Sequence, residues 1–283
     1  MQLQKVKLLT SGMLFAAIGI TTGNAWADTN KKADSPHSFE AGINYFHFDY
    51  KEDLTPPSKS TEEEWLPGTR LVYTYKAGEA TMPIYYRILV DYADGDTDYD
   101  GSTQAGDPAY GTTDNTFFTG ELNIGYTFKG YVDVTAYTGV GYRYWDRGDI
   151  GGPGSYSEEY SWGYLPVGVR TDYKITDKLS GAVDISAHYM FGGRIKVLFS
   201  EYDPTYNNGK ADLGNKMGWK VEAPVQYRFT PKWSFVATPW FEFSKIGRGD
   251  NFILTDGSTV LIAYEPASET KQYGVTLGFK AHF

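Results

Sequence analysis

The feature that most constrains the fold is the strict alternation of the last eleven residues, YGVTLGFKAHF. One set of alternate positions is aromatic or aliphatic: Tyr273, Val275, Leu277, Phe279, Ala281 and Phe283. The positions between them are small or polar: Gly274, Thr276, Gly278, Lys280 and His282. Because successive side chains of an extended strand point to opposite faces, the pattern predicts a β-strand with one wholly apolar face.

The same alternation recurs along the chain and predicts ten strands. They span residues 38–50, 65–76, 82–92, 116–128, 131–146, 159–173, 179–195, 216–229, 232–246 and 271–283. Short and long connections alternate, and the long ones are residues 51–64, 93–115, 147–158, 196–215 and 247–270. Short turns at one end and long loops at the other are typical of transmembrane β-barrels. We therefore predict an all-β fold, an antiparallel barrel of about ten strands with extracellular long loops and both termini in the periplasm.

The composition favours a membrane barrel over a soluble β-protein. Aromatic residues make up 17% of the chain, with 24 tyrosines, while the mean hydropathy is only −0.43. Alternating strands keep average hydropathy low, and aromatic side chains mark both membrane interfaces. A soluble β-sandwich would also alternate, but it explains neither the aromatic content nor the terminal Phe283.

The N-terminal segment has the features of a secretory signal peptide. Lys5 and Lys7 precede an apolar run over residues 13–20, and Ala25-Trp26-Ala27 fits a cleavage site. We predict a signal peptide over 1–27 and an outer-membrane barrel domain over 28–283. Removing 1–27 leaves 24 basic and 35 acidic residues, a net charge of −11, which argues against nucleic acid as a partner. The absence of cysteine excludes disulfides and thiolate chemistry.

The alternation also predicts which charges face the barrel interior. The basic set is Arg70, Lys76, Arg87, Arg143, Arg170, Lys220, Arg228 and Lys280. The acidic set is Glu40, Asp91, Glu121, Asp133, Asp172, Asp184, Glu222 and Glu242. Buried charges persist when they are paired, so this balance favours a polar network that plugs the lumen. A charged constriction in a narrow pore is the alternative.

Two segments in the long loops carry a family resemblance. GGPGSYSEE at 151–159 and YDP at 202–204, together with the loop rhythm over the whole mature chain, resemble the omptins, the outer-membrane barrel endoproteases. The terminal strand resembles the signal that the barrel-assembly machinery reads, which implies that machinery as a partner of Phe283. The segment at 142–146 departs from the family's lipopolysaccharide-binding pattern, so no such residues carry over.

The resemblance implies a catalytic water held between an Asp-x-Asp pair and an Asp-x-His pair. Asp94 and Asp96 are candidates for the first pair, and Asp98 and Asp100 continue the same spacing. The second pair is missing, because Phe199-Ser200-Glu201 stands where the resemblance requires Asp-Glu-His. His188, on a predicted strand, is a candidate base. Its alternative role is a member of the interior polar network.

The acidic segment DTDYDGSTQAGD at 96–107 also matches the spacing of a calcium loop. The candidate ligands are Asp96, Asp98, Asp100, Ser102, Gln104 and Asp107, with Gly101 at the turn position. Calcium takes six to eight oxygen ligands, and carboxylates on a tight glycine turn supply them. An ordinary solvated loop is the alternative. No other cofactor is predicted.

These observations predict a non-enzymatic outer-membrane protein, surrounded by membrane lipid and lipopolysaccharide, whose acidic tyrosine-rich loops bind an unknown extracellular ligand. Two alternatives stay open. One is an omptin-like surface endopeptidase with a rearranged base, and the other is a small porin-like passive channel.

Overall fold

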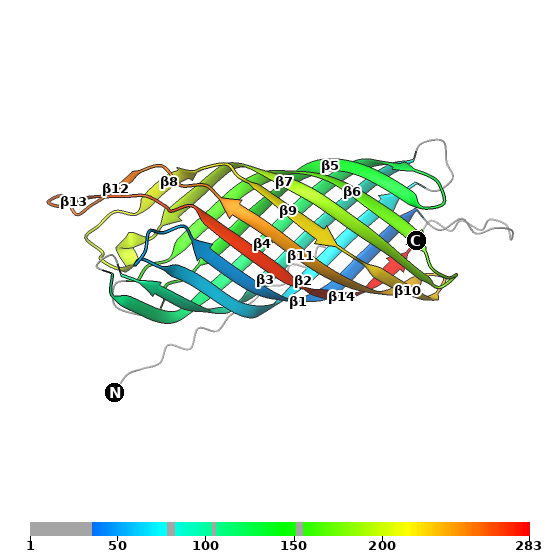
Figure 1. Cartoon of the computed structure of the whole chain (residues 1–283), viewed down its shortest axis with the longest axis horizontal. Helices are drawn as coiled ribbons and strands as arrows, with labels where there is room; N and C mark the ends of the chain where they lie inside the picture. Colours follow the sequence, from blue (N-terminus) through cyan, green and yellow to red (C-terminus); the bar gives the residue numbers. More distant parts are fainter. Residues whose placement is uncertain (1–35, 78–82, 104–105, 151–154) are drawn as a thin grey trace, which may run out of the picture. The chain divides into compact units, whose positions relative to one another are not determined.

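The computed structural model describes residues 36–77, 83–103, 106–150 and 155–283, most of which form strands (Figure 1). The strands are β1 (His37–Glu52), β2 (Ser60–Lys76), β3 (Ile84–Ser102), β4 (Pro108–Phe128), β5 (Asp133–Arg147), β6 (Glu158–Lys174), β7 (Leu179–Val197), β8 (Gly209–Leu213), β9 (Met217–Glu222), β10 (Val225–Thr230), β11 (Trp233–Ile246), β12 (Phe252–Thr255), β13 (Val260–Ala263) and β14 (Ser268–His282). The short 3-10 turn η1 (Phe199–Glu201) is the one helical element in these ranges, and no helix there is long and apolar enough to cross a membrane. The predicted signal peptide lies outside the described residues.

The strands close into an antiparallel barrel. β1 pairs with β2 on one side and with β14 on the other, and β14 pairs with β11, so the first and last strands seal the sheet. β8, β9 and β10 follow one another along β7 and share one position in the barrel. The barrel therefore has ten strand positions, which confirms the predicted fold class.

The eighth strand position is broken for two local reasons. The backbones of Gly214 and Gly247 meet at a bridge, where a side chain on Gly247 would lie 2.6 Å from the Gly214 carbonyl oxygen. Between β9 and β10 stands Pro224, which has no N–H to donate to a neighbouring strand. The interruption at Pro224 divides the strand predicted over 216–229, whereas β8 lies within residues 196–215, which the alternation predicts as a long connection.

Two rings of exposed aromatic side chains bound the lipid-facing surface. The ring near the short connections, here called the turn end, is Tyr126, Phe128, Tyr173, Phe229, Trp233 and Phe279. The ring toward the long connections, here called the loop end, is Tyr45, Trp65, Tyr92, Phe118, Tyr142, Tyr189, Trp219 and Tyr273. Exposed aliphatic residues lie between the rings: Ile43, Leu71, Ile88, Leu122, Val140, Val167, Ile185 and Leu277. The membrane-spanning segments thus run from one ring to the other.

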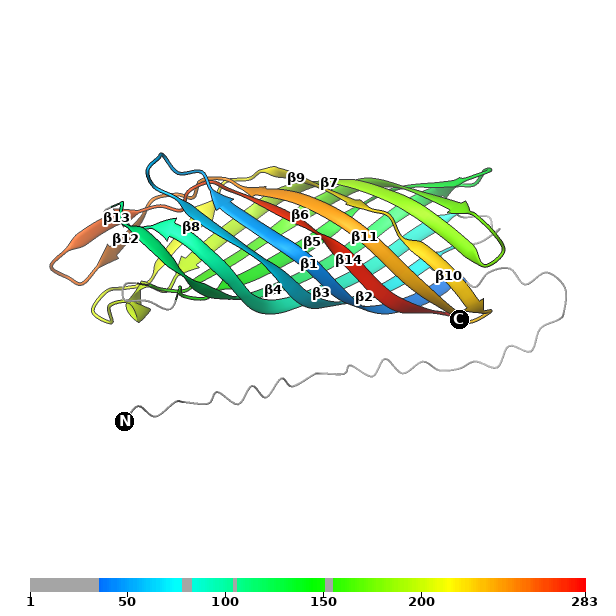
Figure 2. The ribbon, with the colours of Figure 1, turned by 60° about the horizontal axis from the view of Figure 1, so that its bottom comes forward.

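Beyond the loop-end ring the polarity of the two faces reverses. Along β1 the inward residues change from Glu40 and Asn44 to Phe46, Phe48 and Tyr50, all buried. The outward side there faces water instead of lipid, so the apolar residues turn inward and form a core like that of a soluble protein. In Figure 2 the strands β2, β3 and β4 run on to the loop end of the barrel, the end at which β12 and β13 lie.

This reversal overturns one prediction. The long loop expected over 93–115 is largely strand, because β3 runs to Ser102 and β4 begins at Pro108. The part of β3 beyond the loop-end ring has aspartates at the outward positions where a lipid-facing strand has apolar residues. The alternation of apolar and polar residues that predicts the other strands is therefore absent there. The connection 247–270 likewise contains the hairpin β12–β13, which the alternation did not predict.

Candidate functional site

Ion pairs fill the lumen between the two rings. Arg70 donates two hydrogen bonds to Asp91, at 2.7 and 2.8 Å, and its Nη1 donates to Glu222 at 2.7 Å. The other carboxylate oxygen of Glu222 accepts from Arg87 Nη2 at 3.0 Å. Burial of these charges is tolerated because each has an opposite partner. The predicted interior network is therefore confirmed for this layer.

A second layer of charged side chains lies inside the lumen, next to the first layer and closer to the loop end. Arg143 forms an ion pair with Glu242, and Lys220 Nζ lies 3.9 Å from the same carboxylate. The Arg143 guanidinium stands over the ring of Tyr164, 5.2 Å from its centre, and the Tyr164 hydroxyl donates to Glu121 at 2.7 Å. The two layers together obstruct the middle of the lumen.

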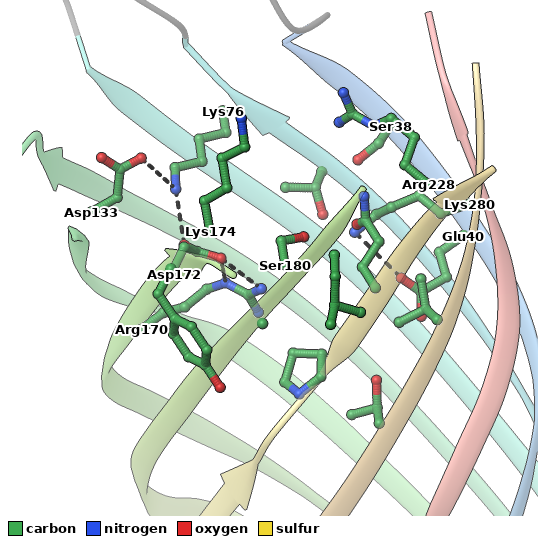
Figure 3. A pocket seen from close by; sticks show the side chains of 18 of the residues that line it. Ser38, Glu40, Lys76, Asp133, Arg170, Asp172, Lys174, Ser180, Arg228 and Lys280 are labelled. Carbon is green, nitrogen blue, oxygen red and sulfur yellow. Dashed lines mark hydrogen bonds and ion pairs between the residues drawn. The ribbon is translucent and has the colours of Figure 1, made fainter. Parts of the chain in front are cut away.

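A pocket of about 480 Å³ occupies the lumen at the turn end (Figure 3). On one side Lys76 Nζ lies 3.1 Å from Asp133 and 2.9 Å from Asp172, and Arg170 also contacts Asp172. Across the pocket stands Lys280, whose Nζ lies 3.4 Å from Glu40. We call this space the turn-end pocket. Its residues come from strands that are far apart in the sequence, so the alternation predicts their inward direction but not this cavity.

His188, the candidate catalytic base, lies inside the barrel. It is 7% exposed, its ring stacks on Tyr164, and its Nε2 is 2.9 Å from the hydroxyl of Ser186. Asp94 and Asp96 point outward from β3, where Asp94 accepts a hydrogen bond from Thr116 at 2.8 Å. The barrel wall therefore separates these aspartates from the histidine. The structure does not bring the three candidates together, and the rearranged omptin site is not assembled from them.

The acidic segment lies along a strand and not around a tight turn. Asp96, Asp98 and Asp100 occupy alternate outward positions of β3, and at about 3.4 Å per residue their carboxylates are spaced by about 7 Å. Asp100 is in an ion pair with Lys59, with 2.5 Å between Nζ and Oδ2.

The prediction of a calcium-binding loop is thus wrong for residues 96–102, which form part of β3. Gln104 lies outside the described residues. Ser102 accepts a hydrogen bond from the backbone N–H of Lys59 at 3.0 Å, and Asp107 is exposed immediately before β4. Within the described ranges no group of three or more histidines and carboxylates is arranged to hold a metal ion. Calcium binding itself stays a prediction.

A buried charge cluster that sequence reasoning missed closes the lumen at the loop end. Arg147 is its centre, with ion pairs to Glu62 (2.5 Å), Glu158 (2.7 Å) and Glu52 (3.4 Å). Tyr160 connects Glu158 to a fourth carboxyl, Glu265, because its hydroxyl oxygen lies 2.8 Å from each. We call these residues the loop-end cluster. The sequence pattern places these residues in loops and at strand ends, so it does not predict that their side chains meet.

Protons compensate the excess of carboxyls in the loop-end cluster, which lies outside the membrane-spanning segments. Burial, with the nearby carboxylates of Glu158 and Glu52, raises the pKa of Glu265 well above its usual range. Burial also raises the pKa of Glu52, against the opposing effect of Arg147. The hydrogen bonds agree, since the single hydroxyl proton of Tyr160 cannot serve two carboxylates. One of the two carboxyls must therefore carry a proton.

Glu265 belongs to the connection that carries the hairpin β12–β13. This hairpin is a separate two-stranded sheet that projects beyond the loop end of the barrel (Figure 1). Its inner side is anchored by buried Phe252 and Leu254, while Ile253, Val260 and Ile262 are 57%, 63% and 71% exposed. Exposed aliphatic residues are expected opposite lipid, but these stand outside the band between the aromatic rings.

Comparison with known proteins agrees with the architecture. The family model described as Autotransporter beta-domain matches residues 71–238, which is more than half of the chain. No curated protein matches the sequence. Among solved structures, the outer membrane protease OmpT from Escherichia coli aligns with 12% identity and a TM-score of 0.59 over 90% of this chain and 100% of that chain. The outer membrane protein OprG from Pseudomonas aeruginosa aligns with 11% identity and a TM-score of 0.43 over 90% of this chain and 99% of that one.

At 12% identity the likeness to OmpT shows the fold alone. It agrees with the closed antiparallel barrel in which β1 pairs with β14. On the match to more than half of its length and on this closed barrel, the chain belongs to the autotransporter beta-domain family and is a ten-stranded outer-membrane β-barrel whose fold is similar to that of OmpT.

Proposed function

We propose that this barrel is a non-enzymatic recognition protein whose loop end faces the cell exterior and binds a macromolecule there. The observation that carries the proposal is the hairpin β12–β13, with aliphatic side chains exposed to water beyond the loop-end ring. Soluble surfaces seldom expose a contiguous aliphatic patch without a partner for it. The rest of this end presents acidic and tyrosine side chains, which make adaptable polar contacts around an apolar centre.

The lumen gives little support to the alternative of a passive channel. The two layers of ion pairs around Glu222 and Glu242 cross its middle. Above them, the aromatic rings of Trp145, Phe48 and Tyr160 pack against one another inside the loop end. An ion would have to displace both a charged and an apolar obstruction.

The three candidate residues for the alternative of an endopeptidase do not come together in a water-activating site. Asp94 and Asp96 lie outside the barrel wall, and His188 lies inside it. A general base must be within hydrogen-bond reach of the proton it takes. Inside the barrel, the side chain within hydrogen-bond distance of His188 Nε2 is Ser186, at 2.9 Å.

Binding by intact cells tests the proposal. Cells that carry the barrel in their outer membrane are applied to an array of immobilised extracellular-matrix proteins and polysaccharides. We expect saturable binding to at least one of them, lost in Ile262→Asp and retained in Tyr131→Asp, a fully exposed aromatic residue at the turn end, between β4 and β5. Equal binding by both variants, or no binding by the parent barrel, would contradict the role of β12–β13.

Three companion assays separate the alternatives. An epitope inserted between Asp256 and Gly257 should be stained on intact cells if the loop end faces outward. Cleavage of a dibasic fluorogenic peptide in the presence of lipopolysaccharide would overturn the non-enzymatic assignment. Reproducible single-channel steps in a planar bilayer would favour the channel instead.

Calcium ordering of the acidic segment is a separate part of the proposal. A calorimetric titration of the refolded barrel with calcium, beside Asp98→Ala and with magnesium as competitor, tests it. Saturable binding that the variant loses would support an ion held on the outer face of β3. A flat titration up to about 10 mM, beyond the weak end of extracellular calcium sites, would show that the aspartates are simply solvated.

A further inference from the structure

We propose that the turn-end pocket binds a small polyvalent anion that carries phosphate. The first reason is its charge. Eight basic side chains line it: Arg70, Lys76, Arg87, Arg170, Lys174, Lys178, Arg228 and Lys280. Five acidic ones do so: Glu40, Asp133, Asp172, Asp177 and Glu222. The lining thus has a formal charge of +3 in a chain whose net charge is −9. Two carboxylates behind the lining, Asp91 and Asp184, pair with Arg70 and Arg170, and the charge stays positive, at +1, when they are included.

The second reason is that the pocket is closed at its inner end. The ion pairs of Arg70 and Arg87 with Glu222 form its floor. The surrounding wall is barrel and lipid, a medium of low dielectric constant that concentrates the field of the basic groups. An anion that enters from the turn end is therefore held there, and it is not passed through the barrel.

The third reason is the arrangement of donors around the space. Lys280 Nζ has its carboxylate partner, Glu40, at 3.4 Å, which is longer than an ideal charged hydrogen bond, and two further protons to donate. Arg170 faces it across the pocket, where its guanidinium contacts Asp172 and lies 3.7 Å from Asp184 (Figure 3). A guanidinium matches the oxygens of a phosphate in two directions, so an incoming phosphate competes with these carboxylates for Arg170. Hydroxyl and amide groups of Ser38, Ser180 and Gln226 complete a polar lining.

The acidic residues of the pocket set its selectivity. Lys76 is already shared by Asp133 and Asp172, so an incoming anion competes with two carboxylates for it. A monovalent anion such as acetate offers no advantage over these resident groups. A phosphate ester or pyrophosphate brings more charge and more oxygens to the same donors, and the volume of about 480 Å³ is within the usual range for a small-ligand site.

Inorganic pyrophosphate is the probe for the first test. Calorimetric titration of the refolded full-length barrel, in a zwitterionic detergent at low salt, should give saturable binding of one pyrophosphate per barrel, with no saturation by acetate. The double variant Lys174→Gln/Lys178→Gln removes two charges at the rim of the pocket, where Lys174 is 68% exposed and its loss leaves the floor intact. We expect binding at least tenfold weaker in this variant.

The control is Lys59→Gln, which removes one exposed charge at the loop end. It should leave pyrophosphate binding within twofold of the parent barrel. Equal weakening by the control and the double variant would show that only the general charge of the molecule matters, and would overturn the proposal. So would the absence of saturation up to about 10 mM while the barrel remains folded by its electrophoretic mobility. The site is at the opposite end from the hairpin, so its test does not depend on the proposed recognition role.

Discussion

Replacing Arg147 by methionine should open the loop end while leaving the membrane-spanning barrel intact. The guanidinium contacts three glutamates at 2.5, 2.7 and 3.4 Å and lies 5.2 Å from the centre of the Tyr50 ring. Methionine conserves much of the volume but leaves the carboxylates without a cation in a buried site. Breaking a buried ion pair by removing one partner costs about 3–5 kcal/mol. We expect a loss of that size in the free energy of opening of the loop end.

Hydrogen exchange of the refolded barrel measures this loss segment by segment. Amides of β12, β13 and the neighbouring residues 247–251 and 264–267 should exchange about two to four powers of ten faster in Arg147→Met, which is the factor that about 3–5 kcal/mol implies at room temperature. Amides between the two aromatic rings should keep their protection. Arg194→Met is the control, because Arg194 is 77% exposed and its ion pair with Asp212 is long, at 3.6 Å. Exposed pairs contribute about 0–1 kcal/mol.

The double variant Arg147→Met/Glu158→Gln tests the electrostatic reason. It removes one of the carboxylates that the single variant leaves uncompensated, so part of the protection should return. Protection that is the same in Arg147→Met and Arg194→Met would refute the assignment of Arg147 as the centre of the loop-end cluster. No return of protection in the double variant would mean that packing, and not charge, explains the loss.

Three further predictions concern other parts of the barrel. Because the folded-state pKa of Glu265 is raised, the stability that its neutral carboxyl contributes is full in acid, below the pKa of the unfolded chain, and is lost as the pH rises through the folded-state value. Residues 247–267 should therefore resist protease better at pH 5 than at pH 8. Glu265→Gln should reduce the difference, and the part that remains belongs to Glu52, whose pKa is also raised. Asp96 stands directly opposite Asp114 across β3 and β4, and like charges in that position are unfavourable. Asp96→Asn should therefore raise the urea midpoint at low salt, by about 0.2–1 kcal/mol in unfolding free energy, and an unchanged or lower midpoint would contradict this. Deleting Phe283, whose ring stacks on His37 with 6.1 Å between centroids, should reduce the amount of assembled barrel in membranes, as measured by heat-modifiable mobility, while Tyr131→Ala should not.

Most of the membrane-spanning fold could be predicted from the sequence. Each strand between the aromatic rings has one face toward lipid and one toward the lumen, and this requirement acts on every second residue. The terminal strand is the clearest example, since its two sets of residues separate without exception, and in the structure it pairs with β1 from Ser38↔His282 to Glu52↔Ser268. The inward direction of Arg70, Asp91 and Glu222 followed from the same pattern.

Only the tertiary structure decided what happens beyond the loop-end ring and which inward residues meet. Outside the membrane the outward face of a strand no longer contacts lipid, so polar residues such as Asp94 and Asp96 can occupy it. The structure shows that both lie in β3, whereas the sequence pattern predicts a loop there. Arg147 and Glu62 are 85 residues apart and touch because the barrel closes and staggers its strands. The alternation along β7 directs His188 into the lumen, and the structure places the acidic row on the outer face of β3, away from it. Alternation along a strand is a local property, and it determines which face of the sheet a side chain occupies. Which side chains meet across the lumen depends on the closure of the barrel and on strand register, which are properties of the whole sheet.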